Sequence, residues 1–255
     1  MPCALVLSAG GLFGAYQAGA WNALSGRFRP EMVVGASVGA INGWAIAGGC
    51  SAAEILAMWL DPAMTAVTRP HFPFLPWKGC IDPAPLEKRV RDLYQRFRPR
   101  VPYSATIVEV PWMRLVRVGQ DRIAPEHLMA SCAVPLGYPP VRIGGRWYVD
   151  GGVLDILPVW AAVEMGATRV LAVNALPRLP SLALRAAAEV VRVVGQRPAR
   201  VSGIEVVEIC PRAPLGTLRD SAIWSAENMR RWIRQGEEDA AANWSRLGSC
   251  SQHDA

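Results

Sequence analysis

The chain has 255 residues, of which 51% are hydrophobic and 19% charged. This composition excludes an intrinsically disordered protein and allows one large core. The net charge of +6 comes from arginines dispersed along the chain, and without a recognition motif it predicts no nucleic-acid partner. No apolar run is long enough to span a bilayer, and the N-terminus lacks the basic start of a secretory signal, so a cytoplasmic protein is expected. Six scattered cysteines without a C-x-x-C pair indicate neither a zinc site nor a disulfide framework.

Short β-branched runs alternate with helical stretches, which predicts a mostly parallel sheet covered by helices. The expected strands are residues 3–8, 31–36, 105–110, 113–118, a hairpin over 141–149 that turns at Gly144-Gly145, 169–173 and 204–209. The expected helices are residues 13–24, 38–47, 52–60, 85–96, 125–132, 159–165, 181–194 and 218–246, the last with an interruption near Gly236. No linker divides the chain, so we expect one domain over residues 1–248 and a disordered tail over 249–255.

Residues 61–85 break this alternation with prolines and aromatic side chains. Proline disfavours helix interiors and central strands, so the segment is expected to be a loop. An ordinary packed loop is the preferred interpretation. A lipid-facing lid over residues 70–77 is the alternative, because Trp77 and Lys78 suit a membrane interface. Two other tryptophans, Trp112 and Trp147, are expected in the core or on a strand face.

The sequence Gly35-Ala36-Ser37-Val38-Gly39 matches G-x-S-x-G between an expected strand and an expected helix. This is the context of a nucleophile elbow, a sharp turn that projects the serine hydroxyl at the end of a strand. Side chains at positions 35 and 39 would collide in such a turn, and the amide of Val38 at the helix N-terminus stabilises negative charge. An ordinary Gly-rich turn is the alternative explanation, so Ser37 is a candidate nucleophile.

A second glycine-rich turn, Ala9-Gly10-Gly11-Leu12-Phe13-Gly14, follows the first expected strand. Consecutive glycines let backbone amides point at an anion, as an oxyanion hole requires. Dinucleotide binding is a minor alternative, since Ala9 replaces the first glycine of G-x-G-x-x-G and no acidic residue follows at the expected distance. A tight turn without a function is the other alternative.

A serine nucleophile needs a base. The histidines lie in the Pro-rich loop, on a short helix and in the polar tail, and none is an attractive candidate: His71, His127 and His253. The remaining candidate is Asp150, at the end of an expected strand and before Gly151-Gly152, although a plain Asp-Gly turn explains the same residues. Aspartate is a weak base, so Asp150 is expected in an apolar pocket beside Ser37, where burial raises its pKa.

Together, the three motifs resemble those of the patatin-like phospholipase family, in which a Gly-rich loop, G-x-S-x-G and D-G-[AG] follow in that order. The flanking segments are similar as well: Gly14-Ala15-Tyr16-Gln17-Ala18-Gly19, Ser131-Cys132-Ala133-Val134-Pro135 and Leu154-Asp155-Ile156-Leu157-Pro158-Val159. The resemblance covers roughly residues 4–175. Three positions depart from the usual pattern: Ala9 replaces glycine, Phe13 replaces arginine or lysine, and Asp155 replaces a common asparagine.

The resemblance implies a three-layer α/β/α sandwich that hydrolyses fatty acyl esters of (phospho)lipids through an acyl-serine intermediate. The implied roles are nucleophile for Ser37, base for Asp150, oxyanion hole for the amides of Gly10, Gly11 and Val38, and motif support for Gly14, Gly35, Gly39, Gly151 and Gly152. No metal or organic cofactor is implied. The implied partner is a lipid or acyl ester, and the positive charge allows peripheral contact with a membrane; no oligomeric state is indicated. A non-catalytic lipid-binding or regulatory module and an acyltransferase with the same dyad stay open as alternatives.

Overall fold

The structure is a computed structural model that describes residues 2–71, 79–178, 189, 193, 195–198 and 203–247. In this part of the chain the strands form one eight-stranded sheet in the order β5-β6-β3-β2-β1-β7-β8, with β4 paired to β3. The strands are β1 (Cys3–Leu7), β2 (Met32–Ala36), β3 (Tyr103–Val110), β4 (Arg114–Gly119), β5 (Val141–Ile143), β6 (Arg146–Asp150), β7 (Arg169–Val173) and β8 (Glu205–Ile209).

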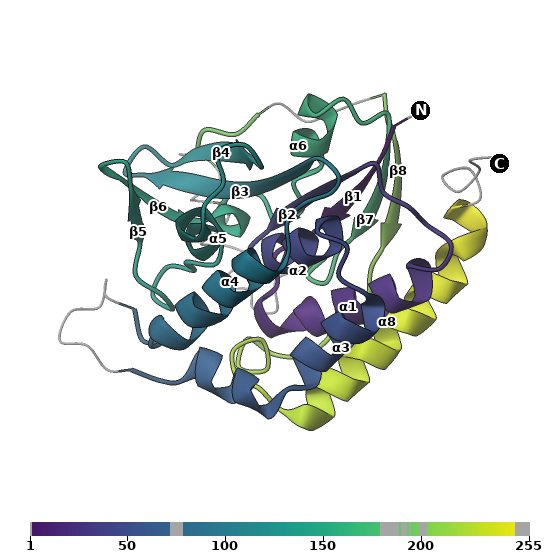
Figure 1. The fold of residues 1–255 in the computed structure, drawn as a ribbon, viewed down its shortest axis with the longest axis horizontal. Coiled ribbons are helices and arrows are strands. Elements are labelled where there is room, and N and C mark those ends of the chain that lie inside the picture. Colours follow the sequence, from purple (N-terminus) through teal and green to yellow (C-terminus); the bar gives the residue numbers. More distant parts are fainter. Residues whose placement is uncertain are drawn as a thin grey trace.

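Helices cover both faces of this sheet (Figure 1). The described α-helices are α1 (Gly14–Leu24), α2 (Val38–Ala47), α3 (Ala52–Leu60), α4 (Ala84–Arg96), α5 (Pro125–Ser131), α6 (Val159–Glu164) and α8 (Ala226–Leu247), and the 3₁₀ helices include η1 (Gly11–Phe13), η2 (Pro62–Thr68) and η4 (Gly151–Val153). Leu5 and Leu7 of β1 pack into a core with α1, α2 and α8, whereas Val6 points to the opposite face, where Trp160 of α6 packs. The expected three-layer α/β/α sandwich is therefore confirmed.

The prediction of a mostly parallel sheet is confirmed. Strands β3, β2, β1, β7 and β8 run parallel to one another, and β1, β2 and β7 are buried apolar runs, as expected of strands covered on both faces. Strands β4 and β6 pair antiparallel with β3, and β5 pairs antiparallel with β6. The predicted hairpin turns at Gly144 and Gly145, whose φ angles of 55° and 82° favour glycine.

Strand β3 brings the ends of β2 and β6 together. β2 runs parallel to β3 and its last residue, Ala36, pairs with Thr106. β6 runs antiparallel to β3 and its last residue, Asp150, pairs with Ile107. Because β4 pairs with residues 104–109 of β3 along the other edge, β2 and β6 occupy the same edge. Their carboxyl ends therefore meet there.

The predicted closing helix is wrong in two respects. The observed helix, α8, begins at Ala226 rather than at residue 218, and it continues through Gly236 without an interruption. The glycine instead permits a close helix contact, because a Cβ atom on Gly236 would collide with the carbonyl oxygen of Tyr16 in α1. On the facing helix, a Cβ atom on Gly19 would collide with the carbonyl oxygen of Ile233.

Three further expectations have mixed outcomes. Trp147 lies on a strand face as predicted, but Trp112 is 68% exposed in the turn between β3 and β4, so its expected place in the core or on a strand face is wrong. The expected loop over residues 61–85 contains η2 and the start of α4. The aromatic segment 72–78, most of the predicted helix 181–194 and the predicted tail 249–255 lie outside the described residues.

Candidate active site

Ser37 occupies the turn between β2 and α2. Its backbone has φ 55° and ψ −129°, a region that residues other than glycine rarely adopt and that costs free energy. Cβ atoms on Gly35 and Gly39 would collide with the backbones of Gly39 and Leu7, respectively, so both motif glycines are sterically required. The G-x-S-x-G sequence thus forms the sharp strand-to-helix turn that the pattern predicts.

Asp150 ends β6 and is 2% exposed. Its Oδ1 atom accepts a hydrogen bond from the amide of Gly152 at 2.7 Å. Burial raises the pKa of Asp150 from 3.8 to about 7, and a hydrogen bond from the Ser37 side chain and the Gly152 amide act in the opposite direction. The other carboxylate oxygen, Oδ2, accepts no hydrogen bond from the described residues. The carboxylate thus lies beside the candidate nucleophile with one oxygen free to accept a proton.

The glycine-rich turn after β1 packs against the elbow. A Cβ atom on Gly14 would collide with the Val38 side chain. Gly11 has a φ of +57°, which favours glycine at this position. The amides of Gly10, Gly11 and Val38 donate no hydrogen bond to any described residue. Each of these N–H groups is therefore a candidate donor for the oxyanion hole that the motifs predict.

Buried amide side chains form hydrogen bonds with the backbone at both ends of the glycine-rich turn. The Nε2 atom of Gln17 donates to the carbonyl oxygen of Ser8 at 2.7 Å. Asn42 Nδ2 donates to the carbonyl oxygen of Gly14 and to Gln17 Oε1, both at 3.0 Å, and Trp59 Nε1 donates to Asn42 Oδ1 at 3.0 Å. The sequence motifs gave no role to these side chains, although Gln17 lies in one of the segments that resemble the family.

The two departures in the turn have local structural explanations. Phe13 is 1% exposed and meets the Trp232 ring of α8 edge-on, with ring centroids 4.9 Å apart. An apolar contact thus anchors the turn at the position where the family usually has a cation. The amide of Ala9 donates to the carbonyl oxygen of Ile156 at 2.8 Å, and a Cβ atom on Gly152 would lie 2.5 Å from the Ala9 methyl group. Gly152 therefore allows the Asp-Gly-Gly segment to approach the glycine-rich turn after β1.

The described histidines do not compete with Asp150. His127 lies at the start of α5, where its Nδ1 atom accepts the amide of Ala124 at 3.1 Å, and burial lowers its pKa. His71 is exposed, and His253 lies outside the described residues. At the opposite end of α5, Ser131 accepts the amide of Ser37 at 2.9 Å. Sequence reasoning assigned Ser131 no role, although it opens the family-like segment Ser131-Cys132-Ala133-Val134-Pro135.

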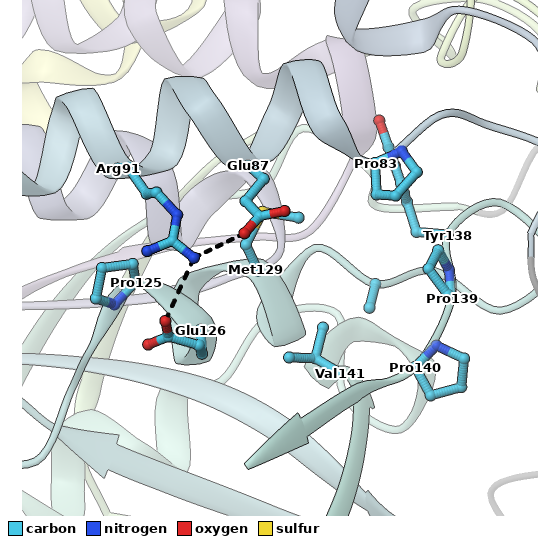
Figure 2. Close-up of a pocket in the computed structure, with 11 residues that line it drawn as sticks. Pro83, Glu87, Arg91, Pro125, Glu126, Met129, Tyr138, Pro139, Pro140 and Val141 are labelled. Atoms are coloured by element: carbon cyan, nitrogen blue, oxygen red, sulfur yellow. Dashed lines mark hydrogen bonds and ion pairs between the residues drawn. The ribbon is translucent and has the colours of Figure 1, made fainter.

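A cavity of about 220 Å³ lies between α4, α5 and the segment that leads into β5 (Figure 2). Most of its lining is apolar or proline: Pro83, Pro125, Met129, Ala133, Tyr138, Pro139, Pro140 and Val141. On one wall, Arg91 bridges Glu87 at 2.7 Å and Glu126 at 3.6 Å (Figure 2). Ser37 and Asp150 do not line the cavity, but the carbonyl oxygen of Ala133 accepts the amide of Asp150 at 3.0 Å. A residue of the cavity wall, Ala133, is thus hydrogen-bonded to the backbone of the candidate base.

Exposed aliphatic side chains flank the site on two loops. Val134 and Leu136, 46% and 70% exposed, follow Ala133 on the loop after α5. Leu218 and Ile223, 54% and 50% exposed, lie on the segment before α8. The carbonyl oxygen of Ser221 in that segment accepts a hydrogen bond from the amide of Leu12, in the glycine-rich turn after β1, at 2.9 Å. Across the described residues, no helix combines the length and the apolar character needed to cross a membrane.

Comparisons with known proteins agree with this fold. The model of the patatin-like phospholipase family matches residues 5–163, more than half of the chain. The chain therefore belongs to the patatin-like phospholipase family, which places it among lipid hydrolases and makes lipids its substrates. An uncharacterized protein of Bacillus subtilis (strain 168), YqhO, is 27% identical over 207 residues, which cover 68% of this chain and 71% of that protein. The crystal structure of VipD from Legionella pneumophila has a similar fold, with a TM-score of 0.57 and 14% identity over 96% of this chain and 67% of VipD.

Proposed function

We propose that the protein hydrolyses fatty acyl esters of phospholipids with Ser37 as the nucleophile and Asp150 as its base. The observation that carries this proposal is the meeting of a strained serine elbow with a buried carboxyl of raised pKa at one edge of β3. A base with a pKa of about 7 is ionised in a large fraction of molecules at neutral pH and is far more basic than an exposed aspartate.

The proposed reaction has two steps. Asp150 accepts the proton of the Ser37 hydroxyl while Oγ attacks the ester carbonyl carbon, and the amides of Gly10, Gly11 and Val38 bind the oxyanion. Collapse of the tetrahedral intermediate expels the alcohol, to which Asp150 returns the proton, and leaves an acyl-serine. Water then attacks the acyl-serine with Asp150 again as the base, which releases the fatty acid and restores the Ser37 hydroxyl.

We assign the acyl chain to the cavity between α4 and α5 (Figure 2). Its lining is largely apolar, which favours a hydrocarbon chain. Its wall includes Ala133, whose carbonyl oxygen is bonded to the Asp150 amide. The acyl chain would therefore lie behind the residue that carries the base.

Peripheral contact with a membrane is the second part of the proposal. Leu136 and Ile223 are exposed aliphatic side chains on loops that hydrogen-bond to the site, and burying such side chains in lipid is favourable. The net charge of +6 adds attraction to anionic lipids. These loops would bring the elbow to the lipid surface.

Labelling with a fluorophosphonate probe tests the nucleophile. The wild type should be labelled, and Ser37→Ala, whose folding is checked by circular dichroism, should not be. Asp150→Asn should lose labelling and lose at least about a thousandfold in the hydrolysis of p-nitrophenyl esters and phospholipids. A folded wild type without labelling would favour a non-catalytic lipid-binding module. Transfer of the acyl group to an added alcohol in preference to water would indicate an acyltransferase.

A further inference from the structure

The β2–β3 hydrogen-bond ladder is interrupted at Ser37. The amide of Val33 donates to the carbonyl oxygen of Pro102 at 2.9 Å. In a parallel ladder alternate residues of one strand donate to the neighbouring strand, so each donor lies two residues beyond the last. The observed register, with Ala36 opposite Thr106, therefore makes the amide of Ser37 and the carbonyl oxygen of Thr106 a donor–acceptor pair of this series.

A side chain from another element stands between these two groups. The Ser37 amide donates to Oγ of Ser131 at 2.9 Å, and the same hydroxyl donates to the carbonyl oxygen of Thr106 at 2.9 Å. Ser131 is the last residue of α5 and has no exposed surface. Its hydroxyl thus replaces the direct ladder hydrogen bond with two bonds in series.

The bridge through the Ser131 hydroxyl is compatible with the strained backbone of Ser37. The backbone of Ser37 turns away from β3 to reach φ 55°, which would leave its amide and the Thr106 carbonyl buried without partners. An unsatisfied buried backbone group is costly, and a hydroxyl satisfies both groups because it accepts one hydrogen bond and donates another. Without the hydroxyl both groups would lose this partner, and a direct hydrogen bond between them would require the Ser37 backbone to move back towards β3.

We infer that Ser131 is a positioning residue for the reaction, which holds the Ser37 backbone in the conformation that directs its hydroxyl at Asp150. The inference rests on the proposed function of Ser37. The end of α5 positions the base as well, because the carbonyl oxygen of Ala133, two residues further on, accepts the amide of Asp150 at 3.0 Å. One short segment, packed against β3 and β6 (Figure 1), therefore holds both members of the dyad in register.

The test compares Ser131→Ala with a matched control, Ser104→Ala. Ser104 is equally buried on β3, and its hydroxyl accepts a hydrogen bond from Arg117 at 3.1 Å, but it lies opposite Val34, two residues before Thr106. Hydrolysis of a soluble p-nitrophenyl ester is measured per labelled active site, so that partial unfolding does not lower kcat. Ser131→Ala should reduce kcat about tenfold to a hundredfold and leave KM within about twofold. Ser131→Thr, which keeps the hydroxyl, should recover most of kcat, and Ser104→Ala should match the wild type.

Several outcomes would overturn the inference. A kcat of Ser131→Ala equal to that of the wild type or reduced no more than in Ser104→Ala would do so, as would a change in KM alone. If Ser131→Ala does not fold, Ser131→Cys, with a weak donor and acceptor in place of the hydroxyl, should show the same loss of kcat in smaller measure. A wild type that is neither labelled at Ser37 nor active would overturn the proposed function and this inference together. A labelled wild type with an equally active Ser131→Ala would overturn the positioning role alone.

Discussion

Ser37 and Asp150 lie side by side because the strands that precede them end opposite neighbouring residues of β3, Thr106 and Ile107. The two strands approach this point from opposite directions along the same edge. The candidate dyad is thus placed by strand pairing rather than by a long loop, which keeps the distance between the two side chains nearly fixed.

Replacing Asp150 with asparagine should stabilise the folded protein at neutral and alkaline pH. Burial raises the pKa of Asp150 to about 7, so the stability that this carboxyl contributes is full below about pH 4 and is lost as the pH rises through about 7. At 1.36 kcal/mol per pKa unit the loss approaches about 4 kcal/mol. Urea denaturation should show the free energy of unfolding falling between about pH 4 and pH 8 by this much more in the wild type than in Asp150→Asn.

The control for that measurement is Asp121→Asn, which removes a charge from an exposed turn residue. It should follow the wild-type pH dependence. Parallel curves for the wild type and Asp150→Asn would contradict the raised pKa of the buried carboxyl.

The pH dependence of hydrolysis should report the same group. Asp150 accepts a proton only when it is ionised, so kcat/KM for a neutral ester should rise with pH, about tenfold per pH unit, and level off above a midpoint near 7. A stopped-flow or spectrophotometric assay with p-nitrophenyl butyrate measures this profile. A midpoint near 4, the usual pKa range of aspartate, would mean that the base is not desolvated in the free enzyme.

Filling the cavity between α4 and α5 should shorten the preferred acyl chain. Val141 lines this cavity from β5, and Val141→Trp would occupy part of the volume. Hydrolysis of p-nitrophenyl palmitate should fall at least about tenfold relative to that of p-nitrophenyl acetate. Arg142→Trp, at the exposed neighbouring position on the same strand, is the matched control. An unchanged ratio in Val141→Trp would place the acyl chain elsewhere.

The exposed aliphatic loops should matter for aggregated lipid only. The double variant Leu136→Asp, Ile223→Asp introduces charge where apolar contact with a membrane is proposed, and Leu136 has a φ of 68°, which aspartate tolerates better than leucine. Hydrolysis of anionic phospholipid vesicles should fall at least about tenfold, while hydrolysis of a soluble short-chain ester should stay within about twofold. Val206→Asp, on the edge strand β8 and 42% exposed, serves as the control. Equal losses on both substrates would contradict the membrane contact.

Sequence patterns predicted the central elements well because strong local signals agree with the tertiary structure there. The bounds of α2, α3 and β7 match the expectation, since apolar runs of suitable length are bounded by glycines or other turn residues. Glycines flank both residues of the candidate dyad, which made them visible as candidates in the sequence, and the structure gives these glycines a steric reason: a side chain at 35, 39, 151 or 152 would meet neighbouring atoms at close range.

Features that depend on strand register or on helix packing were not predictable in this way. The bridging position of Ser131 follows from the pairing of β2 with β3 and from where α5 ends, neither of which leaves a local pattern. Gly236 suggested a break in a helix, yet the residue serves a close contact between two helices far apart in sequence. Trp112 suggested a buried or strand-face position, but a tight turn after β3 leaves it largely in solvent.

The contacts of the glycine-rich turn and α1 with residues 221–236 have a consequence for biosynthesis. The turn near the start of the chain rests on Trp232 and on the carbonyl oxygen of Ser221, and α1 packs closely against α8 at Gly236. A nascent polypeptide in which β2 and β6 have already been synthesised still lacks the residues that make these contacts. The glycine-rich turn therefore reaches its full set of contacts only after residues 221–236 have been synthesised.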